Sequence, residues 1–252
     1  MPESIPLALP LLHLLWIASA IFVGYAIRGM SGFGAGMVST PLMAFVLPAH
    51  VAIPVSGMLA FSLFCILSVR DRGHVIWREF RLLVVPTLAG VGIGLLVFRS
   101  LDGGMLLRAL GFFLMLYAVY MVAAASKWLP ELRCSERWAL PAGFVGATID
   151  TLFGGGGGTL VVIYIHARGL TVKQFRATVA MVWFVEMIAR LAAYSTAGYY
   201  SKDVLILVAG LLPLMWIGTK VGEKIGNRLR PETFSRILAG MLFCAGGSHL
   251  LR

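Results

Sequence analysis

The sequence contains few charged residues. Charged side chains make up 13% of its 252 residues, whereas a soluble domain averages about 25%. Hydrophobic residues, by contrast, account for 59% of the chain. So little charge cannot cover the water-facing surface of a soluble domain. The composition therefore argues against a soluble enzyme or binding domain and indicates a membrane protein.

Other absences narrow the class further. Cys65, Cys134 and Cys244 are too scattered for a disulfide framework, and no Cys/His cluster has metal-ligand spacing. No Gly-x4-Gly-Lys-Ser/Thr sequence occurs, so we expect no ATP binding. The start, Met-Pro-Glu-Ser-Ile-Pro, lacks the basic region of a signal peptide. We expect a retained first segment, no cofactor and no metal.

Apolar stretches near membrane-spanning length recur along the whole chain. A helix needs about 20 such residues to cross roughly 30 Å of hydrocarbon. The sequence therefore predicts an all-α, polytopic helical membrane protein. The stretches cover residues 11–29, 51–69, 80–98, 104–124, 177–197, 203–219 and 234–251.

One segment occurs twice, 122 residues apart. Residues 22–36 and 144–158 agree at seven of fifteen positions: Phe, Val, Gly, Ile and three further glycines. Such self-similarity at a fixed offset indicates an internal duplication. We therefore divide the chain into a first transmembrane repeat (1–125), a cytoplasmic linker (126–138) and a second transmembrane repeat (139–252).

The net charge of +10 is unevenly distributed. Loops rich in Lys and Arg face the cytoplasm, so the charge reports topology and predicts contact with anionic lipids rather than with nucleic acid. Both termini are then outside. In the first repeat a basic loop joins the apolar stretches 51–69 and 80–98. In the second repeat the corresponding loop lies one stretch later, between 203–219 and 234–251. This shift predicts that the repeats are inverted. The basic stretches are 70–81, 126–138, 166–176 and 220–236.

A short apolar segment, 37–48 or 159–168, follows the glycines of each repeat. A helix of this length cannot span the bilayer, so each repeat is expected to contain a broken or re-entrant hairpin. Exposed backbone and a helix N-terminus at such a turn would favour an anion, although the glycines could instead serve close helix packing. The predicted substrate-binding residues are Arg28, Ser31, Gly32, Gly34, Gly36, Gly154, Gly155, Gly156, Gly157, Gly158 and Thr159.

Four ionisable residues lie within or beside apolar segments. Glu186 and Arg190 have the i,i+4 spacing of an ion pair on one helix. Arg28 stands at the C-terminal end of its segment, where a cation complements the helix dipole, whereas Asp150 opposes the dipole at the equivalent place. Asp150 should therefore need a basic partner, such as Arg28, or a proton. We predict coupling or ion-pair roles for Asp150, Glu186 and Arg190.

The two glycine motifs carry a family resemblance. The first copy reads Ser31-Gly32-Phe33-Gly34-Ala35-Gly36 with Pro41 downstream, and the second reads Phe153 followed by five glycines, with Ile163 in place of the proline. This pattern resembles the TauE/SafE sulfite-exporter family of duplicated membrane permeases. The resemblance implies the movement of small anions: sulfite, organosulfonates such as sulfoacetate, or related carboxylates.

These observations together predict an inner-membrane secondary transporter. It would export a small anion by alternating access around two midplane glycine turns, with proton or sodium coupling and a homodimer as further expectations. One alternative is a non-transporting membrane assembly or sensor subunit. Another is a membrane-embedded enzyme, which is disfavoured because no nucleophile–base pair or paired carboxylates occur in the sequence.

Overall fold

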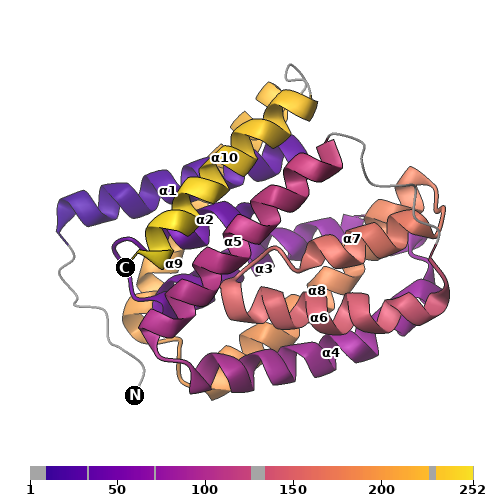
Figure 1. Cartoon of the computed structure of the whole chain (residues 1–252). Coiled ribbons are helices and arrows are strands. Elements are labelled where there is room, and N and C mark those ends of the chain that lie inside the picture. The colour runs from indigo at the N-terminus through magenta and orange to yellow at the C-terminus, as the bar shows by residue number, and fades with distance from the viewer. Residues whose placement is uncertain (1–9, 33, 71, 126–133, 227–230, 252) are drawn as a thin grey trace. The chain divides into compact units, whose positions relative to one another are not determined.

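The computed structural model describes residues 10–32, 34–70, 72–125, 134–226 and 231–251, and Figure 1 shows their arrangement. These residues form α-helices and two short 3-10 helices, with no strand among them. Residues 126–133 of the predicted linker lie outside the described ranges. The elements are α1 (Leu11–Ser31), α2 (Ala35–Met43), α3 (Ala49–Arg70), η1 (Arg72–His74), α4 (Trp77–Ser100), α5 (Gly103–Ala125), η2 (Glu136–Trp138), α6 (Ala139–Phe153), α7 (Gly158–Ala167), α8 (Val172–Thr196), α9 (Lys202–Gly226) and α10 (Pro231–Leu250).

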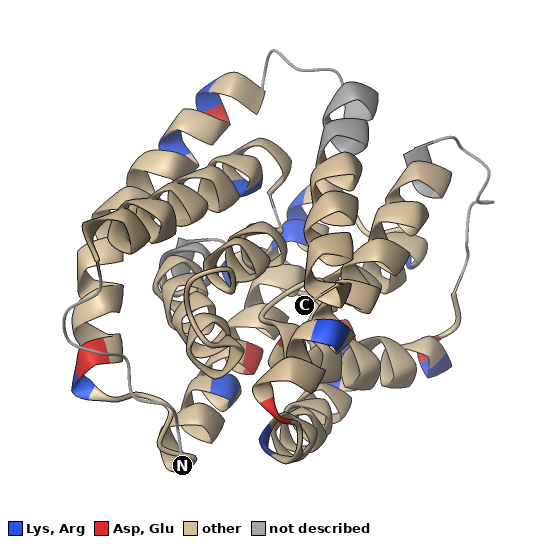
Figure 2. Cartoon of the chain, turned by 60° about the vertical axis from the view of Figure 1, so that its left-hand side comes forward, with Lys and Arg blue, Asp and Glu red and all other residues tan. Residues whose placement is uncertain are grey.

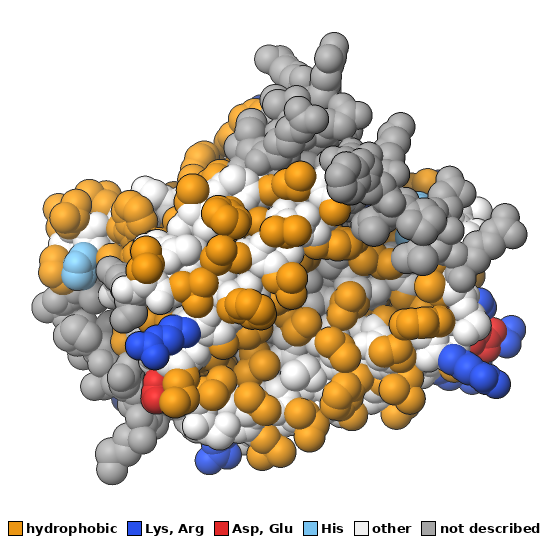
Figure 3. Space-filling model, in the orientation of Figure 1, with side chains coloured by type: hydrophobic (Ala, Val, Ile, Leu, Met, Phe, Trp, Pro, Cys, Tyr) orange, Lys and Arg blue, Asp and Glu red, His pale blue; other side chains and the backbone are white. Residues whose placement is uncertain are grey.

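The all-α prediction is confirmed, and every predicted apolar segment coincides with a helix. Among the described residues, five helices are long and apolar enough to cross a membrane: α1, α4, α5, α8 and α9. In a bilayer the backbone must satisfy its hydrogen bonds internally, which is why such sequences form helices. Most charged residues lie near helix ends (Figure 2), and hydrophobic side chains cover most of the face shown in Figure 3.

The first short segment ends earlier than the sequence suggests. We predicted it over 37–48, but α2 stops at Met43 and residues 44–47 form turns before Pro48. The amide of Leu47 bonds back to the carbonyl of Met43, which closes this turn. Apolar composition continues across the turn, so composition could not reveal where the helix ends.

The chain folds into two compact units that each mix both repeats. The first unit contains α1, α2, the start of α3, α5, α9 and α10, and the second contains the rest of α3 with α4, α6, α7 and α8. The first helix of each repeat therefore packs against the third long helix of the other: α1 on α9, and α6 on α4. The predicted repeats are consecutive in the sequence, whereas each compact unit is built from helices of both repeats.

Glycines on α9 let α1 approach closely in the first unit. A Cβ on Gly218 would lie 2.7 Å from the carbonyl oxygen of Phe22, and one on Gly222 would overlap the carbonyl oxygen of Ala26. The two glycines are four residues apart and so lie on one helix face. This is the small-residue packing that brings membrane helices together.

The second unit repeats this helix contact. A Cβ on Gly90 of α4 would overlap the carbonyl oxygen of Phe144, and one on Gly94 would lie 3.1 Å from that of Thr148. Phe144 and Thr148 stand 122 residues after the α1 positions contacted in the first unit. The duplication seen in sequence therefore extends to helix packing. The inverted orientation of the repeats stays a prediction.

We expect Gly222→Ala to destabilise the protein, because the added methyl group would overlap the Ala26 carbonyl. Overpacking of this kind costs about 1–3 kcal/mol. Gly210→Ala on the same helix is the matched control, since its Cβ would meet no heavy atom within 4 Å. Thermal unfolding midpoints of the two purified variants test this. Equal midpoints would mean that the close α1–α9 contact contributes little.

Candidate functional site

The two glycine turns place left-handed glycines at equivalent positions. Gly32 and Gly154 end their helices with φ of 84° and 78°, and Gly34 and Gly156 follow with φ of 89° and 102°. Each pair is 122 residues apart. Left-handed φ values suit glycine because it has no Cβ. The repeated glycines are therefore explained in part by the turn that both repeats must make.

Close packing explains other glycines of the hairpins. A Cβ on Gly24 would lie 3.0 Å from the carbonyl oxygen of Ala35, and one on Gly146 would lie 2.8 Å from that of Gly157. By contrast, Cβ atoms on Gly32 or Gly34 would meet no heavy atom within 4 Å. The packing alternative thus holds within the hairpins, while the turn glycines themselves leave room beside the backbone.

Asp150 caps the short helix of the second hairpin. Its Oδ1 accepts a hydrogen bond of 2.9 Å from the backbone N–H of Gly157, and its carboxyl group also bonds the backbone of Gly158. The carboxylate thus lies at the positive end of the α7 dipole, which offsets its unfavourable place at the end of α6. The equivalent residue at the first turn, 122 positions earlier, is Arg28. The two turns therefore share left-handed glycines and differ in charge.

Asp150, Glu186 and Arg190 form one buried cluster. Arg190 Nη1 donates a 2.8 Å hydrogen bond to the carbonyl oxygen of Asp150 and lies 3.6 Å from Glu186 Oε1. The carboxyl groups of Asp150 and Glu186 are within hydrogen-bonding reach of each other. Glu186 and Arg190 thus contact each other across one helical turn, and the coupling or ion-pair role assigned to them stays a prediction. The guanidinium beside Asp150 is that of Arg190, not of Arg28 as the sequence analysis considered.

One face of α8 supplies further groups that the sequence analysis missed. The Tyr194 hydroxyl donates to the carbonyl oxygen of Thr151. The indole of Trp183 lies beside Gly158, where an added Cβ would be 2.7 Å from Nε1. This Nε1 is buried and has no hydrogen-bond partner among the described residues. The spacing of Trp183, Glu186, Arg190 and Tyr194 on one helix face was the available signal.

At the first turn, Arg28 is the principal charged group. It lies in the last turn of α1 and is 8% exposed. Tyr25 and Glu223 act electrostatically on its guanidinium. Ser31 donates its hydroxyl hydrogen to the carbonyl oxygen of Ile27 at 2.9 Å. Arg28 and Ser31 thus remain beside the first turn, as the sequence predicts. Of the other predicted residues, Gly36 lies in α2, Thr159 lies in α7, and Gly155 lies in the second turn.

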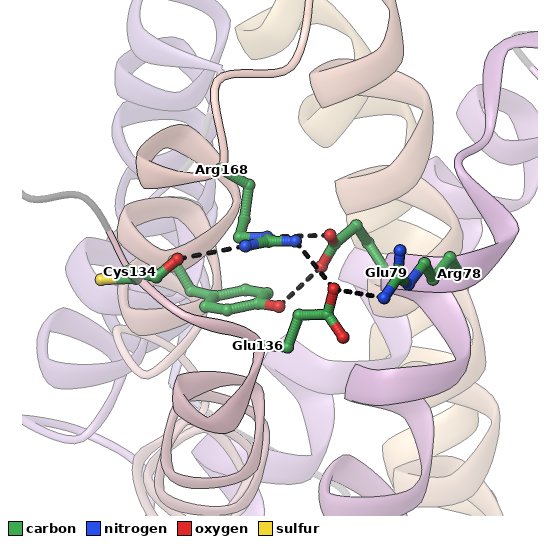
Figure 4. Close-up of polar contacts among 6 residues, drawn as sticks. Arg78, Glu79, Cys134, Glu136 and Arg168 are labelled. Atoms are coloured by element: carbon green, nitrogen blue, oxygen red, sulfur yellow. Dashed lines mark hydrogen bonds and ion pairs between the residues drawn. The ribbon is translucent and has the colours of Figure 1, made fainter.

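A second polar network joins α4, the residues before α6 and the end of α7 (Figure 4). The Tyr164 hydroxyl and Arg168 Nε donate to the two carboxylate oxygens of Glu79, at 2.6 and 2.9 Å. Arg168 also donates to the carbonyl oxygen of Cys134 at 3.2 Å and to Glu136 at 3.1 Å. The hydrogen bond from Glu79 raises the pKa of the Arg168 guanidinium. From the sequence, Arg168 belongs only to a basic stretch that indicates topology. Glu79, an acidic residue within the basic stretch 70–81, was the sequence signal for this network.

We expect Glu79→Gln to lower the unfolding midpoint clearly, because this buried carboxylate accepts from two donors. Hydrogen bonds to charged groups contribute about 1.5–3 kcal/mol each. Arg78→Gln removes the 71% exposed partner of Glu136 and should change the midpoint little, since exposed pairs contribute about 0–1 kcal/mol. Similar shifts for both variants in thermal unfolding would contradict the expectation.

The comparison with known families decides the class of this protein. The family model described as sulfite exporter TauE/SafE matches residues 16–248. The chain belongs to the TauE/SafE family. This confirms the resemblance seen in the glycine motifs and establishes the chain as a member of a membrane transporter family.

Two relatives of this TauE/SafE chain are similar over nearly their whole lengths. The "Probable sulfite/organosulfonate exporter TauE" of Cupriavidus necator is 24% identical over 246 residues, covering 96% of this chain and 95% of the relative. A "Probable membrane transporter protein" of Methanocaldococcus jannaschii is 24% identical over 263 residues, covering 94% and 97%. No solved structure gives a significant match.

Proposed function

We propose that this chain is a secondary transporter that exports a small anion across the cell inner membrane. The substrate class is sulfite, an organosulfonate or a related carboxylate, in keeping with the printed names of the family and of one relative. Inverted repeats with broken helices suit alternating access. Both termini then lie outside, and no enzymatic step is required.

The observation that supports anion binding is the buried Arg28 beside the first glycine turn. Its guanidinium lies at the end of α1, and the next helix, α2, begins directly after Gly34. A buried cation and a helix N-terminus both favour an oxyanion. Arg28, Ser31, Gly32 and Gly34 are the proposed first-turn contacts.

The second turn is proposed to line the path in a different way. Its residues Gly154–Gly158 and Thr159 bring backbone and a hydroxyl to the turn, and Trp183 adds an indole N–H beside Gly158. The Asp150 carboxylate already occupies the first N–H groups of α7. We therefore assign anion binding to the first turn. The second turn contributes the ionisable Asp150 carboxyl group, whose charge acts on an anion that passes it.

Export of an anion needs no ATP. An inside-negative membrane potential favours outward movement by about 2.3 kcal/mol per 100 mV for each net negative charge that crosses. A divalent anion that moves with one proton still carries one such charge. The concentration gradient of a toxic or surplus anion acts in the same direction.

Counterflow tests the proposal. Proteoliposomes containing the purified chain are loaded with unlabelled sulfite or sulfoacetate, and labelled anion is supplied outside. We expect a transient accumulation of label above its equilibrium level, without ATP. Protein-free liposomes are the control. Absence of counterflow for sulfite, sulfoacetate and a simple carboxylate would overturn the assignment as a small-anion transporter.

A further inference from the structure

The charges of the Asp150–Glu186–Arg190 cluster do not balance when all three groups are ionised. The side chains belong to residues that are only 4%, 1% and 0% exposed. Two carboxylates and one guanidinium leave one negative charge in surroundings where an uncompensated charge is costly. A single bound proton makes the cluster neutral.

The hydrogen bonds indicate which carboxyl group holds that proton. Asp150 accepts the N–H of Gly157 at the positive end of α7, an arrangement that suits an ionised carboxylate. Glu186 Oε1 is buried and has no hydrogen-bond partner among the described residues. A protonated Glu186 could donate to the Asp150 carboxylate, which lies within hydrogen-bonding reach. The proton therefore belongs on Glu186, shared with Asp150.

Among the residues that the structure describes, Arg190 brings the one other charge that acts on this pair. The Tyr194 hydroxyl on the same face of α8 is already bonded to the carbonyl oxygen of Thr151. The ionisable side chains of the elements packed nearby lie toward helix ends or in loops: Arg72, His74, Arg78, Glu79, Arg81, Arg99, Glu136, Arg137, Tyr164, His166, Arg168, Lys173 and Arg176.

We propose that Asp150 and Glu186 form a proton-binding site, and that the proton and the transported anion bind together. The second clause rests on the proposed function. Asp150 contacts Gly157 and Gly158, so an anion that reaches this turn comes beside the carboxyl pair. With the proton absent the pair repels the anion, and with the proton present it does not.

An infrared spectrum tests the proton without any transport. Purified full-length protein at neutral pH should show the band of a protonated carboxyl group. Glu186→Gln should remove that band, and raising the pH should remove it from the unmodified protein. Asp203→Asn, at the start of α9, is the control and should keep it. A spectrum without the band, or a band that survives Glu186→Gln, overturns the proton site.

Counterflow of labelled sulfoacetate over a range of pH tests the coupling, because its sulfonate stays ionised throughout. We expect exchange by the unmodified protein to fall about tenfold per pH unit once the proton is lost. Glu186→Gln, which imitates the protonated side chain, should exchange at a rate independent of pH. If the unmodified protein exchanges sulfoacetate at the same rate at all pH values, the coupling of anion binding to the proton is overturned, while the assignment as an anion transporter is retained. If exchange is absent throughout, the proposed function fails, and the infrared result still decides the proton site.

Discussion

Arg190→Gln is expected to leave little folded protein, and the double variant Arg190→Gln/Asp150→Asn should recover much of the loss. The guanidinium is fully buried and contacts both Asp150 and Glu186. Removing one partner of a buried charge pair costs about 3–5 kcal/mol, a large part of a typical stability of 5–15 kcal/mol. The second substitution removes the ionised Asp150 carboxylate, which is buried and has lost its counter-ion, and therefore relieves part of that cost.

Size-exclusion profiles and thermal unfolding midpoints of the detergent-purified variants measure this effect. Arg99→Gln is a suitable control, because Arg99 is exposed at the end of α4 and should tolerate the change. The double variant distinguishes charge from shape. Asparagine is close in size to aspartate, so the single and double variants lack the same arginine atoms and differ in charge. A stable Arg190→Gln protein, or a double variant no better than the single one, would contradict the charge argument.

Arg28→Gln is expected to reduce counterflow of sulfite or sulfoacetate by about 10- to 100-fold. This range corresponds to the loss of a charge-assisted hydrogen bond of about 1.5–3 kcal/mol. Arg28→Lys should keep part of the activity, because it retains the charge but loses the planar fork that binds two oxygens of an oxyanion. Arg108→Gln, at an exposed position of α5, should transport normally.

Ligand-induced stabilisation separates binding from folding for the same variants. A ligand that binds only the folded state raises the unfolding midpoint in a concentration-dependent way. Sulfite should stabilise the unmodified protein and the Arg108→Gln variant, and should not stabilise Arg28→Gln. If Arg28→Gln folds, is stabilised by sulfite and transports at the normal rate, the anion does not depend on Arg28.

Local sequence predicted the features that depend on near neighbours in the chain. Apolar length placed the helices, because a segment in hydrocarbon must satisfy its own backbone hydrogen bonds. The repeated glycines marked the two turns, and the left-handed Gly32 and Gly154 lie where the 122-residue offset places them. The Glu186–Arg190 pair was also predictable, since four residues of helix bring the two side chains together.

Contacts between distant segments were decided by the tertiary structure. The pairing of α1 with α9 and of α6 with α4 depends on which glycine-lined faces fit together, and the two copies of a repeat are too similar for sequence to choose between partners. Arg190 reaches Asp150 across 40 residues, and Arg168 reaches Glu79 across 89. By itself, the sequence determined a duplicated helical membrane protein with two glycine turns. Only packing placed a carboxyl pair and one guanidinium at the second turn, because buried charges find their partners through the fold rather than along the chain.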